Sequence, residues 1–290
     1  GVVPMCESGR NILAKHKKTN KGQIYMNDFI MDDFYNLMEK YDLNVYGLLD
    51  SRCKIHTLGT DSKIIGRIFE IFTQPILEAI SKKHGLILKT PDSQTLYPDF
   101  ILMKDETSKD KITIDVKTTY IDSKSDCMKF TLGSYGSYMR NNTKNIEYRY
   151  TDYIKHYVIG YVYQRNGMAQ ESRVFEFENR SQIQAPYLNI RFFIQEKYKI
   201  AGDKPGSGNT ENIGSISTSR FDDFVEGRGP FSSLGVDVYN IYWKYYPKYR
   251  VSSEDDYHSL NEFKIWIKKH KNDVQLLKDQ SFEKISSLIK

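Results

Sequence analysis

The residues YPDF at positions 97–100 and TIDVKTTY at positions 113–120 decide how the fold is interpreted. Each run places one acid, Asp99 or Asp115, in a stretch whose other residues favour a β-strand. The turn-like segment DETSKD at 105–110 lies between them, so we predict two strands, 97–103 and 111–119, joined as a hairpin. Centring this hairpin on its turn brings Asp99 roughly opposite Asp115 or Val116.

Alternation of side chains along the second strand places Asp115 and Lys117 on the same face. Two carboxylates that converge from neighbouring strands repel each other unless a cation lies between them. A hard divalent ion that keeps several waters fits such a pair, and the lysine can then position or deprotonate a water. This combination suits hydrolysis of a phosphodiester. The alternative is that Asp115 and Lys117 form an ordinary ion pair at the surface.

Glu70 is a third candidate acid, because it interrupts the apolar run IFEIF at 68–72. An acid in such a run either lies at the solvent edge of its helix or points into a functional site.

Composition excludes several classes of protein. The chain has 290 residues, 39% hydrophobic and 27% charged, which is typical of a globular protein of one large or two modest domains. No apolar run approaches the roughly 18 residues of a membrane helix, and the first residues lack the apolar block of a signal peptide. We therefore expect a cytoplasmic protein. Cys6, Cys53 and Cys127 form no CxxC motif, so we expect reduced thiols and no zinc site.

Two polar segments are candidates for binding nucleic acid, although the net charge of +5 alone does not argue for it. Residues 128–145 carry three bases, no acid and many hydroxyl and amide side chains, which suit phosphates and sugars. The segment GSGNT at 206–210 lacks the pattern of a Walker loop. Its Asn209 can bond an adenine, and Thr210 can contact a thymine methyl. An ordinary solvated loop is the alternative for both segments.

Periodicity predicts an α/β fold with a mostly antiparallel or mixed sheet. A long helix begins at Thr60 or Asp61 and stops at Gly85, and Pro75 must kink or divide it. A shorter helix covers 28–41, and the chain after about Ser233 is helical, with Trp243 and Trp266 as anchors. Further β-segments are expected at 45–49, 54–58, 154–163, 173–177 and 190–200.

Seven segments, in this order between about Tyr41 and Gly229, resemble the EcoRV-type type II restriction endonucleases of the PD-(D/E)xK nuclease superfamily. They are LGTDSKIIGRIFEIFTQPI (58–76), YPDF (97–100), IDVKTTY (114–120), KFTLGSYGSYMRNNTKNI (129–146), VIGYVYQR (158–165), IAGDKPGSGNTENIGS (200–215) and DFVEGRG (223–229). The chain departs from the family's pattern at Ser93, Thr95, Leu96 and Thr218–Arg220, which affects contacts to flanking DNA.

This resemblance implies a restriction-endonuclease-like sheet flanked by helices, with a small dimerisation subdomain around 45–58 and 174–187. Residues 1–40 would form an N-terminal arm and helix, 41–232 the catalytic and DNA-binding core, and 233–290 a helical C-terminal region. It implies a homodimer that cuts double-stranded DNA with Mg²⁺. Mn²⁺ would substitute, and Ca²⁺ would bind without turnover. A cognate DNA methyltransferase would accompany the enzyme in the cell, and no membrane is involved.

The resemblance also implies roles for individual residues. Asp99 and Asp115 would be metal ligands, Lys117 the catalytic lysine and Glu70 an auxiliary acid able to hold a second ion. The implied major-groove loop consists of Gly206, Ser207, Gly208, Asn209 and Thr210. Gln94 would belong to a minor-groove loop, and the implied contacts to the DNA backbone are Ser137, Asn142 and Lys144.

The implied target is GATATC, cut bluntly at its central TA step. A pyrimidine–purine step unstacks easily, so a dimer that bends DNA there can select TA without touching it. The alternative is another PD-(D/E)xK nuclease, of the repair or junction type, without this sequence specificity.

Overall fold

A computed structural model describes residues 29–122, 125–206, 211–251, 253–279, 282 and 285. The chain divides into two compact units. The first unit consists of Gly1–Leu88, Thr118–Asp126 and Ile159–Ile194, and the second of Lys89–Lys117, Cys127–Val158 and Gln195–Lys290. The chain therefore passes between the units several times. The division of the sequence into 1–40, 41–232 and 233–290 stays a prediction.

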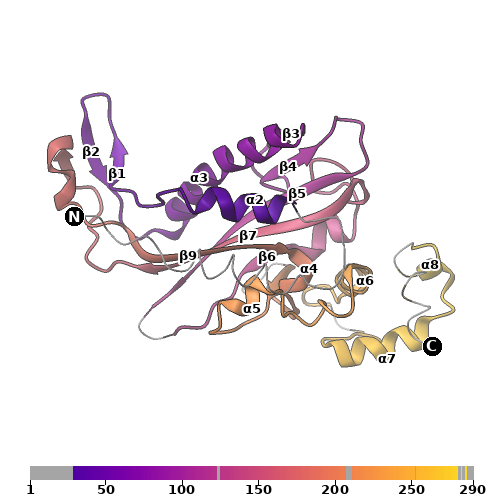
Figure 1. The fold of residues 1–290 in the computed structure, drawn as a ribbon. Coiled ribbons are helices and arrows are strands. Elements are labelled where there is room, and N and C mark those ends of the chain that lie inside the picture. Colours follow the sequence, from indigo (N-terminus) through magenta and orange to yellow (C-terminus); the bar gives the residue numbers. More distant parts are fainter. Residues whose placement is uncertain are drawn as a thin grey trace. The chain divides into compact units, whose positions relative to one another are not determined.

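A five-stranded sheet has the strand order β3-β4-β5-β7-β9. Strands β4 and β5 pair antiparallel, as the hairpin prediction expected. Smaller sheets and helices accompany this sheet, so the α/β class is confirmed (Figure 1). Its strands are β3 (Ile87–Lys89), β4 (Phe100–Met103), β5 (Lys111–Ile121), β7 (Tyr153–Arg165) and β9 (Tyr187–Glu196).

Helices α2 (Phe29–Met38) and α3 (Ser62–Lys83) pack on the strands of the first unit (Figure 1). Phe69 of α3 is fully buried and stacks on Tyr161 of β7, with ring centroids 4.4 Å apart. Phe34 of α2 meets Phe192 of β9 edge-on at 6.0 Å. These aromatic contacts bury the apolar stripe of each helix, which is the main source of helix stability in a folded protein.

The ends of α3 follow from its sequence. The carboxylate of Asp61 accepts hydrogen bonds from the backbone N–H groups of Lys63 and Ile64, at 2.8 and 3.1 Å. Gly85 has a φ of +63°, the left-handed conformation that ends helices. Of the two alternatives for Pro75, a kink or a division of the helix, the division is wrong, because α3 runs without a break through Pro75. Pro75 and Ile71 are both exposed, so the carbonyl that loses its donor to the proline can reach water.

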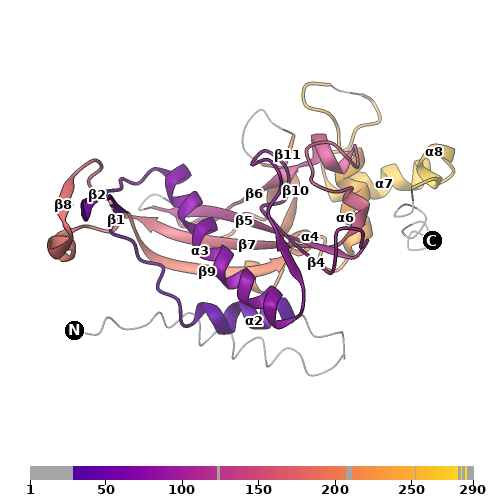
Figure 2. The ribbon, with the colours of Figure 1, turned by 90° about the horizontal axis from the view of Figure 1, so that it is seen from above.

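A small antiparallel sheet in the first unit has the order β1-β2-β8 (Figure 2). The strands are β1 (Gly47–Leu49), β2 (Lys54–Thr57) and β8 (Val174–Glu176), with the 3₁₀ segment η3 (Phe177–Gln182) after them. It lies where the dimerisation subdomain was expected. Ile55 of β2 is buried, but four large apolar side chains of this sheet and η3 are exposed: Leu48, Leu49, Val174 and Phe177.

The second unit contains another small sheet, of order β10-β11-β6, and most of the short helices. The prediction of a strand to residue 200 is wrong, because the chain turns into α4 at Lys197. Trp243 of α6 is fully buried, as expected of an anchor. The elements are β6 (Thr131–Ser134), η1 (Tyr135–Met139), η2 (Tyr150–Asp152), α4 (Lys197–Ile200), β10 (Ala201–Pro205), β11 (Asn212–Ser215), α5 (Asp222–Val225), α6 (Val236–Tyr245), α7 (Leu260–His270) and α8 (Val274–Leu277).

Cys53 and Cys127 are exposed and form no disulfide with each other, and the sulfur of Cys127 lies 3.0 Å from the hydroxyl of Ser217. Cys6 lies outside the described residues. Within the described ranges, no helix is both long and apolar enough to cross a membrane.

Candidate active site

The β4–β5 hairpin brings Asp99 and Asp115 together in the second unit. Phe100 pairs with Ile114, and extending this register by one residue sets Asp99 opposite Asp115. Oδ2 of Asp99 accepts a hydrogen bond of 2.7 Å from the backbone N–H of Val116. This bond orients the carboxylate of Asp99 along the neighbouring strand, towards the side chain of Asp115.

Lys117 completes the group from the same strand as Asp115. Its Nζ lies 2.9 Å from Oδ2 of Asp115 and 3.8 Å from Oδ2 of Asp99. The side chain of Asp115 is only 4% exposed, whereas those of Asp99 and Lys117 are 30% and 26% exposed. A ligand can therefore reach Asp99 and Lys117 from solvent, with Asp115 lying deeper behind them.

The two carboxyl groups titrate differently. Burial and the negative charge of Asp115 raise the pKa of Asp99 to about 7, against the opposing effect of Lys117. Burial acts the same way on Asp115, but Lys117 and Lys197 hold the pKa of Asp115 below its usual value. The pair therefore holds one proton, on Asp99, below about pH 7. A cation between the carboxylates would displace that proton and remove the repulsion.

A buried polar network, which the sequence did not reveal, lies beside the pair. Nζ of Lys197 donates a 2.8 Å hydrogen bond to the Tyr97 hydroxyl, two residues before Asp99. The same hydroxyl lies 2.9 Å from Oγ1 of Thr113 and 2.9 Å from Nδ1 of His156. Burial lowers the pKa of Lys197 to about 8, and it lowers that of His156 well below its usual value. Near neutral pH the network thus carries the charge of Lys197 beside an uncharged imidazole.

The donor set fits a hard divalent ion. No group of three His, Cys, Asp or Glu side chains able to hold a metal occurs in the described part of the chain. Mg²⁺ does not require one, because it usually keeps several waters and takes one or two carboxylates together with substrate phosphates. Asp99 and Asp115 supply such a pair. The buried Oδ2 of Asp115 makes no hydrogen bond of good geometry, and the nearby ammonium of Lys117 balances its charge.

The other predicted site residues belong to other elements of the chain. Glu70 belongs to the first unit, where its carboxylate pairs with Arg67 at 2.6 Å. In the second unit, Gln94 and Lys144 are exposed, whereas Ser137 is buried in the π-helical segment η1.

The side-chain amide of Asn142 already makes two hydrogen bonds to Thr151. Its Oδ1 accepts from the backbone N–H at 2.9 Å, and its Nδ2 donates to the hydroxyl at 3.1 Å. Gly206 is half-buried at the end of β10, and Ser207, Gly208, Asn209 and Thr210 lie outside the described residues.

Comparison with known proteins defines the class of this chain. The family model described as "Restriction endonuclease EcoRV" matches residues 38–268. The type II restriction enzyme EcoRV of Escherichia coli is 42% identical over 239 residues, covering 82% of this chain and 96% of that enzyme. The structure of NlaIV restriction endonuclease is also similar, over 91% of this chain and 85% of the other. At 8% identity and a TM-score of 0.35, that similarity carries no weight.

The protein is thus a restriction endonuclease, a site-specific deoxyribonuclease. Within that class, the chain belongs to the EcoRV restriction endonuclease family.

Proposed function

We propose that this enzyme is a Mg²⁺-dependent homodimer that hydrolyses double-stranded DNA at GATATC and leaves blunt ends. The proposed hydrolysis is supported by the convergence of two carboxylates and one ammonium. Nζ of Lys117 lies within 4 Å of both Asp99 and Asp115. In this proposal Asp99 and Asp115 hold the ion, and Glu70 is the auxiliary acid.

The bound Mg²⁺ would supply Lewis-acid stabilisation of the phosphate oxygens and a more acidic water. The chain's own residues set the conditions for this. Asp99 releases its proton when the site is loaded, and its partial exposure leaves the carboxylate accessible to the scissile phosphate. Lys117 places a positive charge next to both carboxylates, where it can orient the attacking water and stabilise negative charge that develops on the phosphate.

The proposed specificity rests on sequence similarity. The segment GSGNTENIGS at 206–215 resembles the base-reading loop of the family, and the 42% identical relative is the EcoRV enzyme itself. Asn209 and Thr210 would contact the outer base pairs in the major groove. Gly206, Ser207 and Gly208 would allow a close approach of the backbone to DNA. Gln94 would contact the minor groove, and Ser137, Asn142 and Lys144 would contact the DNA backbone.

The proposed dimer has support in the small sheet β1-β2-β8. Leu48 and Leu49 are 62% and 60% exposed on neighbouring positions of β1, and Val174 and Phe177 add to the exposed apolar surface of the first unit. Leu48 and Val174 lie on one face of the sheet, because both are in register with His56 of β2. Exposed apolar patches mark interaction surfaces in soluble proteins. A two-fold axis through such an interface matches the symmetry of a palindromic site. In the cell we propose a cytoplasmic enzyme accompanied by a methyltransferase that protects the same sequence.

Digestion of a genome of known sequence with the purified protein, followed by sequencing of the fragment ends, tests the proposal. Blunt ends between T and A of GATATC are expected with Mg²⁺ or Mn²⁺. Ca²⁺, which accepts looser geometry, should support specific binding without cutting. A different consensus or staggered ends would refute the proposed specificity. Fragments without any consensus would favour a repair-type or junction-type nuclease of the same superfamily.

A further inference from the structure

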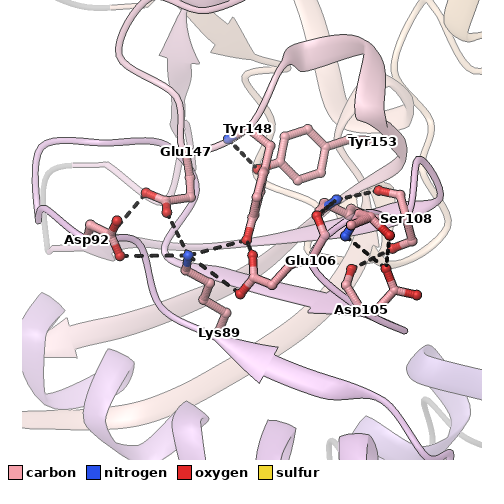
Figure 3. Close-up of polar contacts among 10 residues, drawn as sticks. Lys89, Asp92, Asp105, Glu106, Ser108, Glu147, Tyr148 and Tyr153 are labelled. Atoms are coloured by element: carbon pink, nitrogen blue, oxygen red, sulfur yellow. Dashed lines mark hydrogen bonds and ion pairs between the residues drawn. The ribbon is translucent and has the colours of Figure 1, made fainter.

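Lys89, the last residue of β3, lies within ion-pair distance of three carboxylates in the second unit (Figure 3). Its Nζ lies 2.9 Å from Glu147, 3.7 Å from Asp92 and 3.8 Å from Glu106, and it donates a 3.2 Å hydrogen bond to the hydroxyl of Tyr148. The carboxylates differ in burial. The side chain of Glu147 is 5% exposed, against 60% for Glu106 and 82% for Asp92. Glu147 is therefore the principal partner of Lys89.

Glu147 also holds both ends of the segment that follows Lys89. Its second carboxylate oxygen accepts a hydrogen bond of 3.1 Å from the backbone N–H of Asp92. Its own backbone N–H donates to the carbonyl of Tyr97 at 3.0 Å, and the N–H of Tyr97 donates to Asn145 at 3.1 Å. The segment 90–96 is thus fastened at its beginning by a side chain and at its end by backbone pairing.

Segment 90–96 and the segment that leads to Glu147 both carry residues of the proposed DNA interface. Exposed Gln94 lies in the middle of segment 90–96, and catalytic Asp99 follows two residues after Tyr97. Asn142 and Lys144 lie just before Glu147 on the other segment. We infer that the Lys89–Glu147 ion pair is a positioning device, which holds the Gln94 segment in register with the backbone-contacting segment and with Asp99 when DNA is bound. This inference rests on the proposed function.

The geometry explains why Glu147 rather than the other acids performs this role. The hydrogen bond to Glu147 raises the pKa of Lys89 despite the opposing effect of burial, so the ammonium keeps its charge beside this carboxyl group. Removing one member of a nearly buried pair leaves the other charge uncompensated, whereas an exposed pair contributes little. Asp92 and Glu106 cannot replace Glu147, because their carboxylates lie in solvent and farther from Nζ.

The test compares Glu147→Gln with Glu106→Gln, which removes the same charge beside the same ammonium. For Glu147→Gln, we expect cleavage of a specific duplex at saturating Mg²⁺ to slow by on the order of 10- to 100-fold in single turnover, because small misplacements of reacting groups have effects of this size. Glu106→Gln should stay within about threefold of the wild type. Both variants should bind non-specific DNA with the same salt dependence as the wild type.

Two further variants separate positioning from simple loss of structure. Lys89→Gln breaks the pair from its other side and should reproduce the slow cleavage, whereas Lys89→Arg keeps the charge and should restore it. In a Gln94→Ala background, Glu147→Gln should have a smaller effect, because both changes act through one segment. If Glu147→Gln does not fold, Lys89→Gln replaces it in the comparison. The melting temperature of Lys89→Gln is then measured beside that of the wild type.

Equal cleavage rates for Glu147→Gln and Glu106→Gln would overturn the inference while leaving the proposed function intact, provided that the wild type cuts its site. Full additivity of Glu147→Gln and Gln94→Ala would overturn it as well. Absence of specific cleavage by the wild type would refute the proposed function, and this inference with it.

Discussion

Asp99 and Asp115 are the side chains on which cleavage should depend most strongly. Asp99→Ala and Asp115→Ala each remove a proposed metal ligand, and a metal ion contributes several kcal/mol to stabilisation of the transition state. We therefore expect each variant to cut supercoiled plasmid on the order of a thousandfold more slowly than the wild type, or slower still. Asp110→Asn, which removes an acid from the solvent-exposed turn of the same hairpin, is the matched control. Near-normal cleavage by Asp99→Ala or Asp115→Ala would refute the site.

The raised pKa of Asp99 also predicts a pH-dependent stability. An acid whose pKa rises from 3.8 to about 7 on folding binds a proton more tightly in the folded state. Its contribution to stability is therefore fully present below about pH 4 and is lost as pH rises through 7. Asp99→Asn removes this fall in stability, because the amide carries no charge at any of these pH values. Without metal, the variant should be more stable than the wild type at pH 8 by about 1–3 kcal/mol and equal to it near pH 4.

Thermal unfolding in EDTA across pH 4 to 8 measures this difference. The expected value lies below the roughly 4 kcal/mol of the complete shift, because the side chain of Asp99 is 30% exposed and solvent screens its interactions. A melting-temperature difference that is independent of pH would show that folding does not raise the pKa of Asp99.

The two segments that we propose to bind DNA should respond differently to substitution. Asn209→Ala removes a proposed bidentate base contact, worth about 1–3 kcal/mol and lost twice in a dimer. Specific binding in Ca²⁺ should fall strongly, with little change in binding to random DNA. Lys144→Ala removes a proposed phosphate contact, so it should weaken binding to every sequence and flatten the salt dependence. Salt titrations of both variants on both DNAs test this. Identical behaviour would contradict the assignment of base and phosphate contacts.

The hairpin that carries Asp99, Asp115 and Lys117 was predictable because all its information is local. A short turn sets the register, and alternation sets the faces. The ends of α3 were predictable for the same reason, since Asp61 and Gly85 act within one turn of the helix. Where prediction failed, longer-range context decided. The segment KYKI continues the alternation of β9, yet it coils into α4 and buries Lys197 against Tyr97.

The network around Lys197 could not have been found from the sequence. Tyr97, Thr113, His156 and Lys197 are separated by up to about a third of the chain, and none lies in a motif that requires the others. Only the folded chain brings them together, with Thr113 on β5, His156 on β7, Lys197 on α4 and Tyr97 shortly before β4. A buried lysine also has low prior probability, because burial of an ammonium is costly unless hydrogen bonds and nearby carboxylates compensate for it.

The assembled enzyme should depend on the exposed sheet β1-β2-β8. Replacing Leu48 and Leu49 together with Glu places charges on the apolar surface that we propose as the dimer interface. Interface hot spots contribute at least about 2 kcal/mol each, so loss of one such contact should weaken the dimer by at least about 30-fold. Ile265→Glu, at an exposed apolar position of α7 in the second unit, is the matched control. Light scattering over a concentration series measures the change, and a wild type that is monomeric both free and on DNA would contradict the dimer.

The buried Trp243 gives the protein an optical signal of its own. The chain has 22 tyrosines and two tryptophans, and the indole of Trp243 lies 5.2 Å from the ring of Tyr135, 5.2 Å from Tyr242 and 4.9 Å from Tyr246. At such separations, light absorbed by these phenol rings is transferred efficiently to the indole and re-emitted there. Helix α6 packs on η1, which precedes the proposed DNA contacts Asn142 and Lys144. Trp266 also lies near tyrosines, 5.3 Å from Tyr257, so in a Trp266→Phe variant the tryptophan emission excited through tyrosine would follow changes in that region in real time without an added label.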